Sequence, residues 1–257
     1  LGHRADHRGV RLAIETGNML GKDYWVAGVI LWWLMTRPGS LVIVTGPSQT
    51  LLGTVTWKEI RRAVDGCPFD LGVEVSAGAK ASPLQVLVDG KGWQCLGYST
   101  TSVERASGQH AEDLLVVVEE ASGLDAEIWA AIESLGYSKL VMIGNPIRAE
   151  GGFVDACDEA AADRLAGIPP EESCCHRNVP SHAGPDADFT EAELKAAGRK
   201  TGLANKTWLE AQKRKYGEHS PIYRRQVLAI RPAVSHEAMF TPARLDACTS
   251  DEARAAV

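Results

Sequence analysis

The residues best equipped for chemistry form one turn, Thr16-Gly17-Asn18-Met19-Leu20-Gly21-Lys22-Asp23, between an expected strand and an expected helix. The turn approaches the phosphate-binding pattern G-x4-G-K-[ST], in which backbone N–H groups surround a phosphate and the lysine binds its outer oxygens. Thr16 replaces the first glycine, and Asp23 replaces the hydroxyl residue that normally binds Mg²⁺. Because a carboxylate also binds Mg²⁺, we expect the whole turn to bind ATP and Asp23 to hold the metal. An ordinary strand-turn-helix corner is the alternative.

Two adjacent acids, Glu119 and Glu120, follow the most apolar segment of the chain, residues 114–118. Carboxylates at the tip of a buried strand cost free energy unless they have partners. In nucleotide hydrolases, the first acid of such a pair holds Mg²⁺ and the second polarises the attacking water. We therefore assign metal binding to Glu119 and the general-base role to Glu120. A solvated strand end that caps the next helix is the alternative.

Two further side chains are candidates for the same site. Asn145 ends the next apolar segment, in Ile143-Gly144-Asn145-Pro146, where its amide could respond to the γ-phosphate. A plain Gly-Asn-Pro turn is the alternative. Arg105 precedes the acidic strand and is our candidate for a cation that neutralises transition-state charge, either in its own subunit or in a neighbour. A surface arginine explains it equally well.

The net charge of −6, from 33 acidic and 27 basic residues, excludes a protein that coats nucleic acid through its overall charge. A contact with DNA would need a local basic patch, for which the basic residues between Lys195 and Arg225 are the candidate. A solvated helix face is the alternative. The six cysteines include Cys174-Cys175-His176, but adjacent cysteines rarely reach one zinc ion. We expect free thiols.

Apolar segments that alternate with helical patterns predict a mainly parallel sheet. The expected strands are 11–15, 41–45, 114–118, 139–143 and 174–179. The expected helices are 22–35, the stretch after Ser48 to about Val64, 125–134, 153–165, 189–197 and 206–216. Residues 66–100 contain the hairpin signal Asp89-Gly90 and predict an antiparallel insertion at the edge. Lys22 and the acid pair should then converge from neighbouring strand ends onto one triphosphate.

The chain shows no signal-peptide pattern, and its longest apolar stretch, residues 24–35, is too short to span a membrane. It begins with Leu1, close to the phosphate-binding turn, as an excised fragment would.

Taken in order, these segments resemble the ATPase domain of tailed-phage terminase large subunits. The resemblance covers about residues 11–245 and rests on 17–23, 45–49, 57–60, 107–111, 119–123, 143–146 and 216–224. It implies an α/β P-loop NTPase fold, a RecA-like three-layer sandwich with a central, mainly parallel sheet. Asn18 and Met19 stand where some relatives carry an arginine, which leaves Arg105 as the candidate finger.

The same resemblance implies hydrolysis of ATP with Mg²⁺ that drives double-stranded viral DNA into a procapsid. The implied partners are the portal protein, the terminase small subunit and further copies of the chain in a ring. The implied location is the cytoplasm of the infected bacterial host, with no membrane contact. Residues 1–230 would form the ATPase domain and residues 231–257 a linker towards a nuclease domain, so we expect no nuclease activity from this chain.

Two other functions stay open. A helicase-like ATPase would share these strand tips, but it needs a second RecA-like domain for which 257 residues leave no room. A nucleotide-binding assembly module with little hydrolysis is favoured slightly by the unusual acids Asp23 and Glu119. A dehydrogenase-type sheet is disfavoured because the sequence lacks the pattern GxGxxG.

Overall fold

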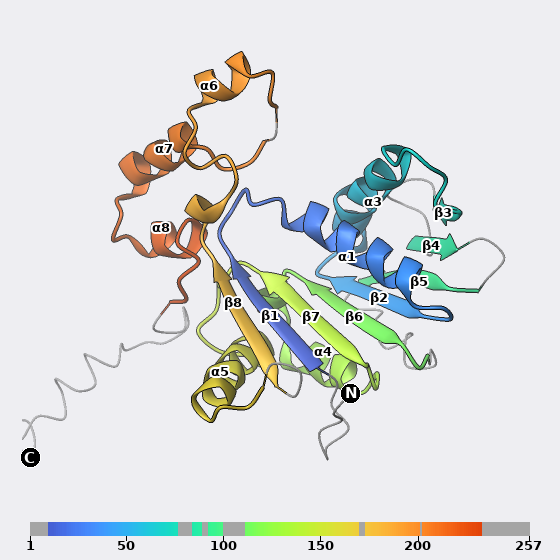
Figure 1. Ribbon diagram of the computed structural model, residues 1–257. Coiled ribbons are helices and arrows are strands. Elements are labelled where there is room, and N and C mark those ends of the chain that lie inside the picture. Colours follow the sequence, from blue (N-terminus) through green and yellow to red (C-terminus); the bar gives the residue numbers. More distant parts are fainter. Residues whose placement is uncertain are drawn as a thin grey trace, which may run out of the picture.

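The computed structural model describes residues 10–76, 84–88, 92–99, 111–169, 173–200 and 202–232. Their centre is an eight-stranded sheet with the strand order β3-β4-β5-β2-β6-β7-β1-β8 (Figure 1). The strands are β1 (Val10–Thr16), β2 (Leu41–Gly46), β3 (Val73–Val75), β4 (Leu84–Val88), β5 (Gln94–Ser99), β6 (Leu114–Glu119), β7 (Lys139–Gly144) and β8 (Cys174–Val179). From β5 to β8 in this order, neighbouring strands pair parallel, whereas β3 with β4 and β4 with β5 pair antiparallel.

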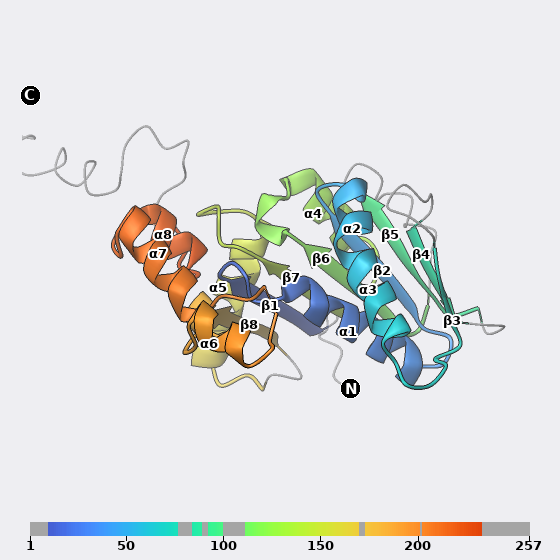
Figure 2. The ribbon, with the colours of Figure 1, turned by 90° about the horizontal axis from the view of Figure 1, so that it is seen from above.

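Helices cover both faces of the sheet and produce the expected three layers. On one face lie α1 (Lys22–Thr36), α2 (Gln49–Thr54) and α3 (Thr56–Asp65), and on the other lie α4 (Ala126–Glu133) and α5 (Gly152–Leu165). Beyond the β8 edge stand α6 (Glu191–Ala196), α7 (Lys206–Tyr216) and α8 (Pro221–Gln226) (Figures 1 and 2). The short 3-10 helices η2 (Ala121–Gly123) and η4 (Ser181–Ala183) follow β6 and β8.

The central strands explain why the sheet is parallel and two-sided. Every residue of β2 and of β6 is buried, which is the pattern of strands covered by helices on both faces. Their side chains alternate between two separate cores, one under α1 to α3 and one under α4 and α5. Because the strands are parallel, the carboxyl ends of β1, β2, β6 and β7 meet at one edge of the sheet.

Three local expectations differ from the structure. The helix expected up to Val64 is interrupted at Val55, which separates α2 from α3. The strand β5, expected in the antiparallel insertion, pairs parallel with β2 and lies inside the sheet. The helix α8 was not expected, although Ser220 caps it and Pro221 opens it, a common pair at a helix start.

The strand order corrects one spatial expectation. The strand that leads into the phosphate-binding turn, β1, and the acidic strand, β6, are not neighbours, because β7 pairs with both of them. Along the chain β7 follows β6, but no residue pattern signals its insertion next to β1. Side chains from β1 and β6 must therefore meet across the end of β7.

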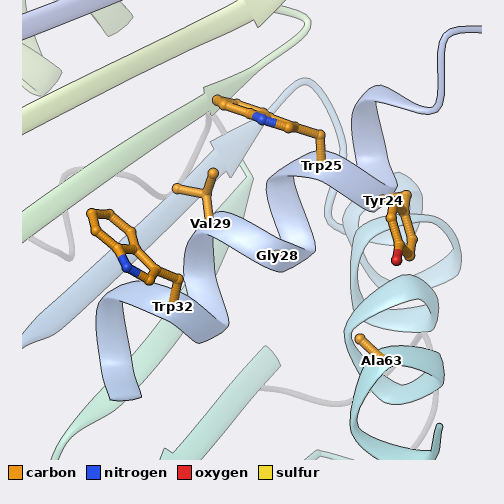
Figure 3. Close-up of a pocket in the computed structure, with 6 residues that line it drawn as sticks. All are labelled: Tyr24, Trp25, Gly28, Val29, Trp32 and Ala63. Atoms are coloured by element: carbon orange, nitrogen blue, oxygen red, sulfur yellow. The ribbon is translucent and has the colours of Figure 1, made fainter. Parts of the chain in front are cut away.

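The outer side of α1 is unusually apolar for an exposed surface. Tyr24 and Trp32 are 64% and 53% exposed, whereas a helix that is apolar on all sides is normally buried. Figure 3 shows these two side chains with Trp25 and Val29, which line a shallow pocket near Gly28, a residue without a side chain. Among the described residues, no helix is long and apolar enough to cross a membrane.

Adding one methyl group should have opposite effects on stability at two glycines, Gly28 and Gly97. A Cβ at Gly28 would meet no atom within 4 Å, so Gly28→Ala should stabilise the chain by about 0.8 kcal/mol through helix propensity. A Cβ at Gly97 would lie 2.6 Å from Trp57 Cη2 and 3.0 Å from Leu84 Cβ, so Gly97→Ala should cost about 2 kcal/mol by overpacking. Urea unfolding of both variants beside the unmodified chain measures the two changes. Equal shifts in the same direction would contradict the packing described.

Candidate nucleotide-binding site

The expected phosphate-binding turn connects β1 to the first turn of α1. Gly21 precedes the helix with φ of 74°, a left-handed conformation that glycine adopts without strain. Met19 has φ of 58°, which costs a residue with a side chain about 1 kcal/mol. The first N–H groups of α1 have no acceptor inside the helix, and they carry the positive end of its dipole. The turn therefore presents donors suited to an anion.

This turn is held in place by the last residue of β8 and the last residue of α8. The N–H groups of Gly17 and Asn18 donate to the carbonyl oxygens of Val179 (2.8 Å) and Gln226 (2.7 Å). These two N–H groups are thereby engaged with the protein, which leaves phosphate binding to donors closer to α1. A Cβ on Gly17 would lie 2.3 Å from Ser181 Oγ, so this glycine is needed for close packing.

Lys22 and Glu120 meet across the end of β7. The Lys22 Nζ donates to Glu120 Oε1, and the side chains are 20% and 35% exposed. The convergence expected between the lysine and the acid pair is therefore present. Glu120 also has φ of 49°, a left-handed backbone that is rare for a non-glycine residue. Strain of this kind gathers at functional sites, where the surrounding structure enforces it.

Glu119 is the more buried of the two acids, with 6% of the residue exposed. Its Oε2 accepts a hydrogen bond of 2.6 Å from Thr56 Oγ1. Its Oε1 is buried and has no hydrogen-bond partner in the part of the chain that the structure describes. Burial raises the pKa of Glu119 to about 7, and the hydrogen bond from Thr56 opposes this rise. The structure thus provides a fixed carboxylate with one unused oxygen.

Asp23 completes a cluster with excess negative charge. Burial raises the pKa of Asp23, and the nearby Glu120 raises it further, while Lys22 lowers it. Three carboxylates, those of Asp23, Glu119 and Glu120, therefore interact around one ammonium group. Oxygen ligands with surplus negative charge are the donor set that Mg²⁺ prefers. The residues expected to hold the metal fit a divalent cation, and the unpartnered oxygen of Glu119 is the observation that supports this fit.

Asn145 connects the ends of the neighbouring strands. Its Nδ2 donates to the carbonyl oxygen of Thr16 at 2.6 Å, and its own carbonyl oxygen accepts from Ser122 Oγ. Gly144 lets this strand end approach Glu120, because a Cβ there would lie 3.2 Å from the Glu120 Cα. Asn145 therefore ties the two turns together: its side-chain amide bonds to the turn after β1, and its backbone carbonyl oxygen bonds to the turn after the acid pair.

Some expected site features fall outside the described residues. These are Arg105, residues 107–110 of the segment 107–111 that carries the resemblance, and residues 233–257 of the expected linker. Sequence reasoning also missed the role of Thr56, which lies 63 positions from Glu119 and in no recognised pattern. It missed the support by Val179 and Gln226 as well, since backbone contacts leave no mark on residue type.

The five cysteines that the structure describes are free thiols, as expected. Cys174 is buried under α5 and donates through Sγ to the carbonyl oxygen of Ala156, whereas Cys175 faces the opposite side of the sheet. A different group, Glu15, Cys157 and His176, brings its donor atoms within 4.8 Å of one another. Arg231 Nε lies 2.9 Å from Glu15 Oε1, so a guanidinium already supplies the positive charge there.

Comparison with known proteins gives a consistent result at the level of fold. No protein-family model matches the sequence, and no curated protein sequence matches it. The large terminase ATPase domain of Thermus phage P74-26 superposes with a TM-score of 0.53 at 16% identity, covering 86% of this chain and 88% of that one. The large terminase of the thermophilic bacteriophage D6E gives 0.57 at 15% identity, covering 86% of this chain and 48% of that one.

The D6E large terminase in complex with ADP gives a TM-score of 0.56 at 15% identity, covering 89% of this chain and 49% of that chain. This chain thus spans about half the length of the D6E proteins. The expected α/β RecA-like fold and its likeness to terminase ATPase domains are confirmed.

The burial of Glu119 predicts a pH dependence of stability. Because its pKa is raised to about 7 in the folded chain, the folded state holds this proton more tightly than the unfolded state. Stability should therefore fall as the pH rises from about 5 to 8, by about 2 to 3 kcal/mol for this one group. Glu119→Gln should lose this part of the slope, measured by urea unfolding at each pH in buffer without divalent cations. Parallel slopes for the two proteins would contradict the assigned burial of charge.

Proposed function

We propose that this chain is the ATPase part of a terminase large subunit and hydrolyses ATP to move double-stranded viral DNA into a procapsid. The observation that carries the proposal is the meeting of Lys22 with Glu120, beside Glu119 and Asp23, at the carboxyl ends of parallel strands. Ligands in open α/β sheets bind at this edge. The fold likeness to a terminase ATPase domain and to a large terminase solved with ADP supports the binding of a nucleotide.

Each group has a role that follows from its place. The N–H groups at the start of α1 and the Lys22 ammonium bind the phosphates of ATP. Asp23 and Glu119 hold Mg²⁺, which when bound neutralises charge on the phosphate oxygens. The phosphates compete with Glu120 for the ammonium of Lys22, so binding of ATP releases this carboxylate to accept a proton from water. Asn145, whose amide bonds to the Thr16 carbonyl oxygen, couples the loss of the γ-phosphate in the turn to a movement at the end of β7.

The motor context extends this proposal to partners. We infer a homo-oligomeric ring on the portal protein, assisted by the terminase small subunit, in the cytoplasm of the infected bacterial host. In such a ring, Arg105 of one subunit is the candidate cation for the transition state in another. The basis is the resemblance of sequence and fold to terminase ATPase domains.

A second function is favoured by one observation. The contact of Glu120 with Lys22 also suits a module that binds nucleotide without hydrolysing it, because a paired carboxylate is a weaker base. A measurement of phosphate release distinguishes the two functions, because an assembly module binds ATP but releases no phosphate.

The basic surface of α7 and α8 is the proposed DNA contact. Arg214, Lys215 and Arg224 are exposed at the last turns of these helices, on the group of helices that stands beyond the β8 edge (Figure 1). Lys213 instead pairs with Glu218 at 2.6 Å. Exposed cations at this spacing suit the phosphate backbone, which is bound without regard to base sequence.

Substitutions at the lysine-glutamate contact test the ATPase. Lys22→Ala should abolish ATP binding, because it removes the cation among three carboxylates. Glu120→Gln should keep ATP binding and lower phosphate release by about 100-fold or more, because the general base is lost. Phosphate release with and without double-stranded DNA, beside fluorescent ATP-analogue binding, measures both. Undiminished hydrolysis by Glu120→Gln would contradict the assignment, and binding without any hydrolysis in the unmodified chain would favour the assembly module.

The salt dependence of DNA binding tests the basic surface. Arg214→Ala with Lys215→Ala should reduce the slope of log affinity against log salt by about 2, one for each phosphate that the side chains no longer neutralise. Lys58→Ala with Arg62→Ala in α3 removes the same charge far from α7 and serves as the matched control. Fluorescence anisotropy with a random-sequence duplex gives both slopes. An equal reduction in the two double variants would show that the overall charge, and not this surface, sets the affinity.

A further inference from the structure

A buried threonine fixes the carboxylate that we assign to the metal. Thr56 is fully buried, and its Oγ1 donates to Glu119 Oε2 at 2.6 Å. One hydrogen bond to a carboxylate limits both the rotation of its plane and the choice of oxygen left for another ligand. Here the remaining oxygen, Oε1, is buried and has no hydrogen-bond partner among the residues that the structure describes.

The unused oxygen belongs to the same cluster as the phosphate-binding lysine. Asp23, Lys22 and Glu120 all interact electrostatically with the Glu119 carboxylate. Thr56 belongs to a different element, as the first residue of α3, and bonds to the other oxygen of the carboxylate. The threonine therefore occupies Oε2 and leaves Oε1 for another ligand.

Thr56 is itself held by the edge of the sheet. The next residue, Trp57, is fully buried against Gly97 and donates through Nε1 to the carbonyl oxygen of Gln85 at 3.3 Å. One turn later, Arg61 donates to the carbonyl oxygen of Ser76 at 3.0 Å. The helix interruption at Val55 starts α3 at the threonine. The hydroxyl group is thus attached to a rigid support that includes β4 and β5.

We propose that Thr56 is a positioning residue that holds Glu119 in the orientation needed to bind a divalent cation beside the nucleotide. This inference rests on the proposed function, because it takes Glu119 as a ligand of that cation. Groups that orient metal ligands from behind typically change metal affinity by about 10- to 100-fold when they are removed. A purely structural hydroxyl would change stability and leave metal affinity alone.

The test compares three threonine variants of the full chain. Thr56→Val keeps the shape and removes the donor, and Thr56→Ser keeps the donor. Thr54→Val makes the same change at an exposed α2 residue whose hydroxyl donates to the carbonyl oxygens of Thr50 and Leu51. The probe is Mn²⁺ in the presence of ADP, followed by electron paramagnetic resonance, with ADP binding measured separately without metal. Thr56→Val should weaken Mn²⁺ binding by about tenfold or more, with ADP affinity unchanged. Thr56→Ser and Thr54→Val should stay within about twofold of the unmodified chain.

The outcomes separate this inference from the proposed function. An unmodified chain that binds neither ADP nor Mn²⁺ would defeat the proposed function. An unmodified chain that binds both, with Thr56→Val equal to it in Mn²⁺ affinity, would overturn only the role of Thr56. Should Thr56→Val fail to fold, Thr56→Ser decides alone: a tenfold loss of Mn²⁺ binding despite the retained hydroxyl would also overturn that role.

Discussion

The structure depends on one charge constraint at the carboxyl edge of the sheet. Three carboxylates, from Asp23, Glu119 and Glu120, lie around a single ammonium, that of Lys22. Removing one partner from such a set leaves charge uncompensated in a site partly shielded from water, which is more costly than the loss of a surface ion pair. These charged side chains stay close together because the parallel strands β1, β7 and β6 end at the same edge of the sheet. A cation and a polyphosphate would together resolve the imbalance that the protein alone leaves.

The turn between β1 and α1, the proposed phosphate-binding site, is supported from outside the sheet as well as from within it. Asn145 holds the Thr16 carbonyl oxygen from the β7 side, while the end of β8 bonds to Gly17 and the end of α8 bonds to Asn18. The same part of the chain carries Arg231, which pairs with the buried Glu15 one residue before the turn. Movement of α6 to α8 would therefore act directly on the backbone of the turn. In the proposed motor, this would be a short physical connection between the nucleotide and the basic helices proposed to contact DNA.

The sequence predicted most of the sheet, because strands buried on both faces are nearly continuous apolar runs, as in β2, β6 and β7. It predicted the meeting of Lys22 with Glu120, since residues at strand ends gather at one edge. It did not predict that β7 lies between β1 and β6, because strand order is set by packing over the whole sheet. It also missed the break at Val55, where the burial of Thr56 and Trp57 overrides a favourable helical pattern. Tertiary contacts of this kind outweigh local propensity.

The unfavourable features of the site argue for function more strongly than its favourable ones. Glu120 adopts a left-handed backbone, Glu119 is buried with an oxygen unpartnered within the described chain, and Met19 carries a further positive φ. Each feature costs of the order of 1 kcal/mol or more, a noticeable share of the roughly 5–15 kcal/mol that stabilises an ordinary domain. A strand-turn-helix corner with no ligand would gain stability by replacing these residues with glycine, glutamine or serine. Features of this kind also occur elsewhere, as at Ala229, which has φ of 54°, and at the buried hydroxyl of Ser40. The concentration of three of them around Lys22 is the reason to propose a reaction at this edge.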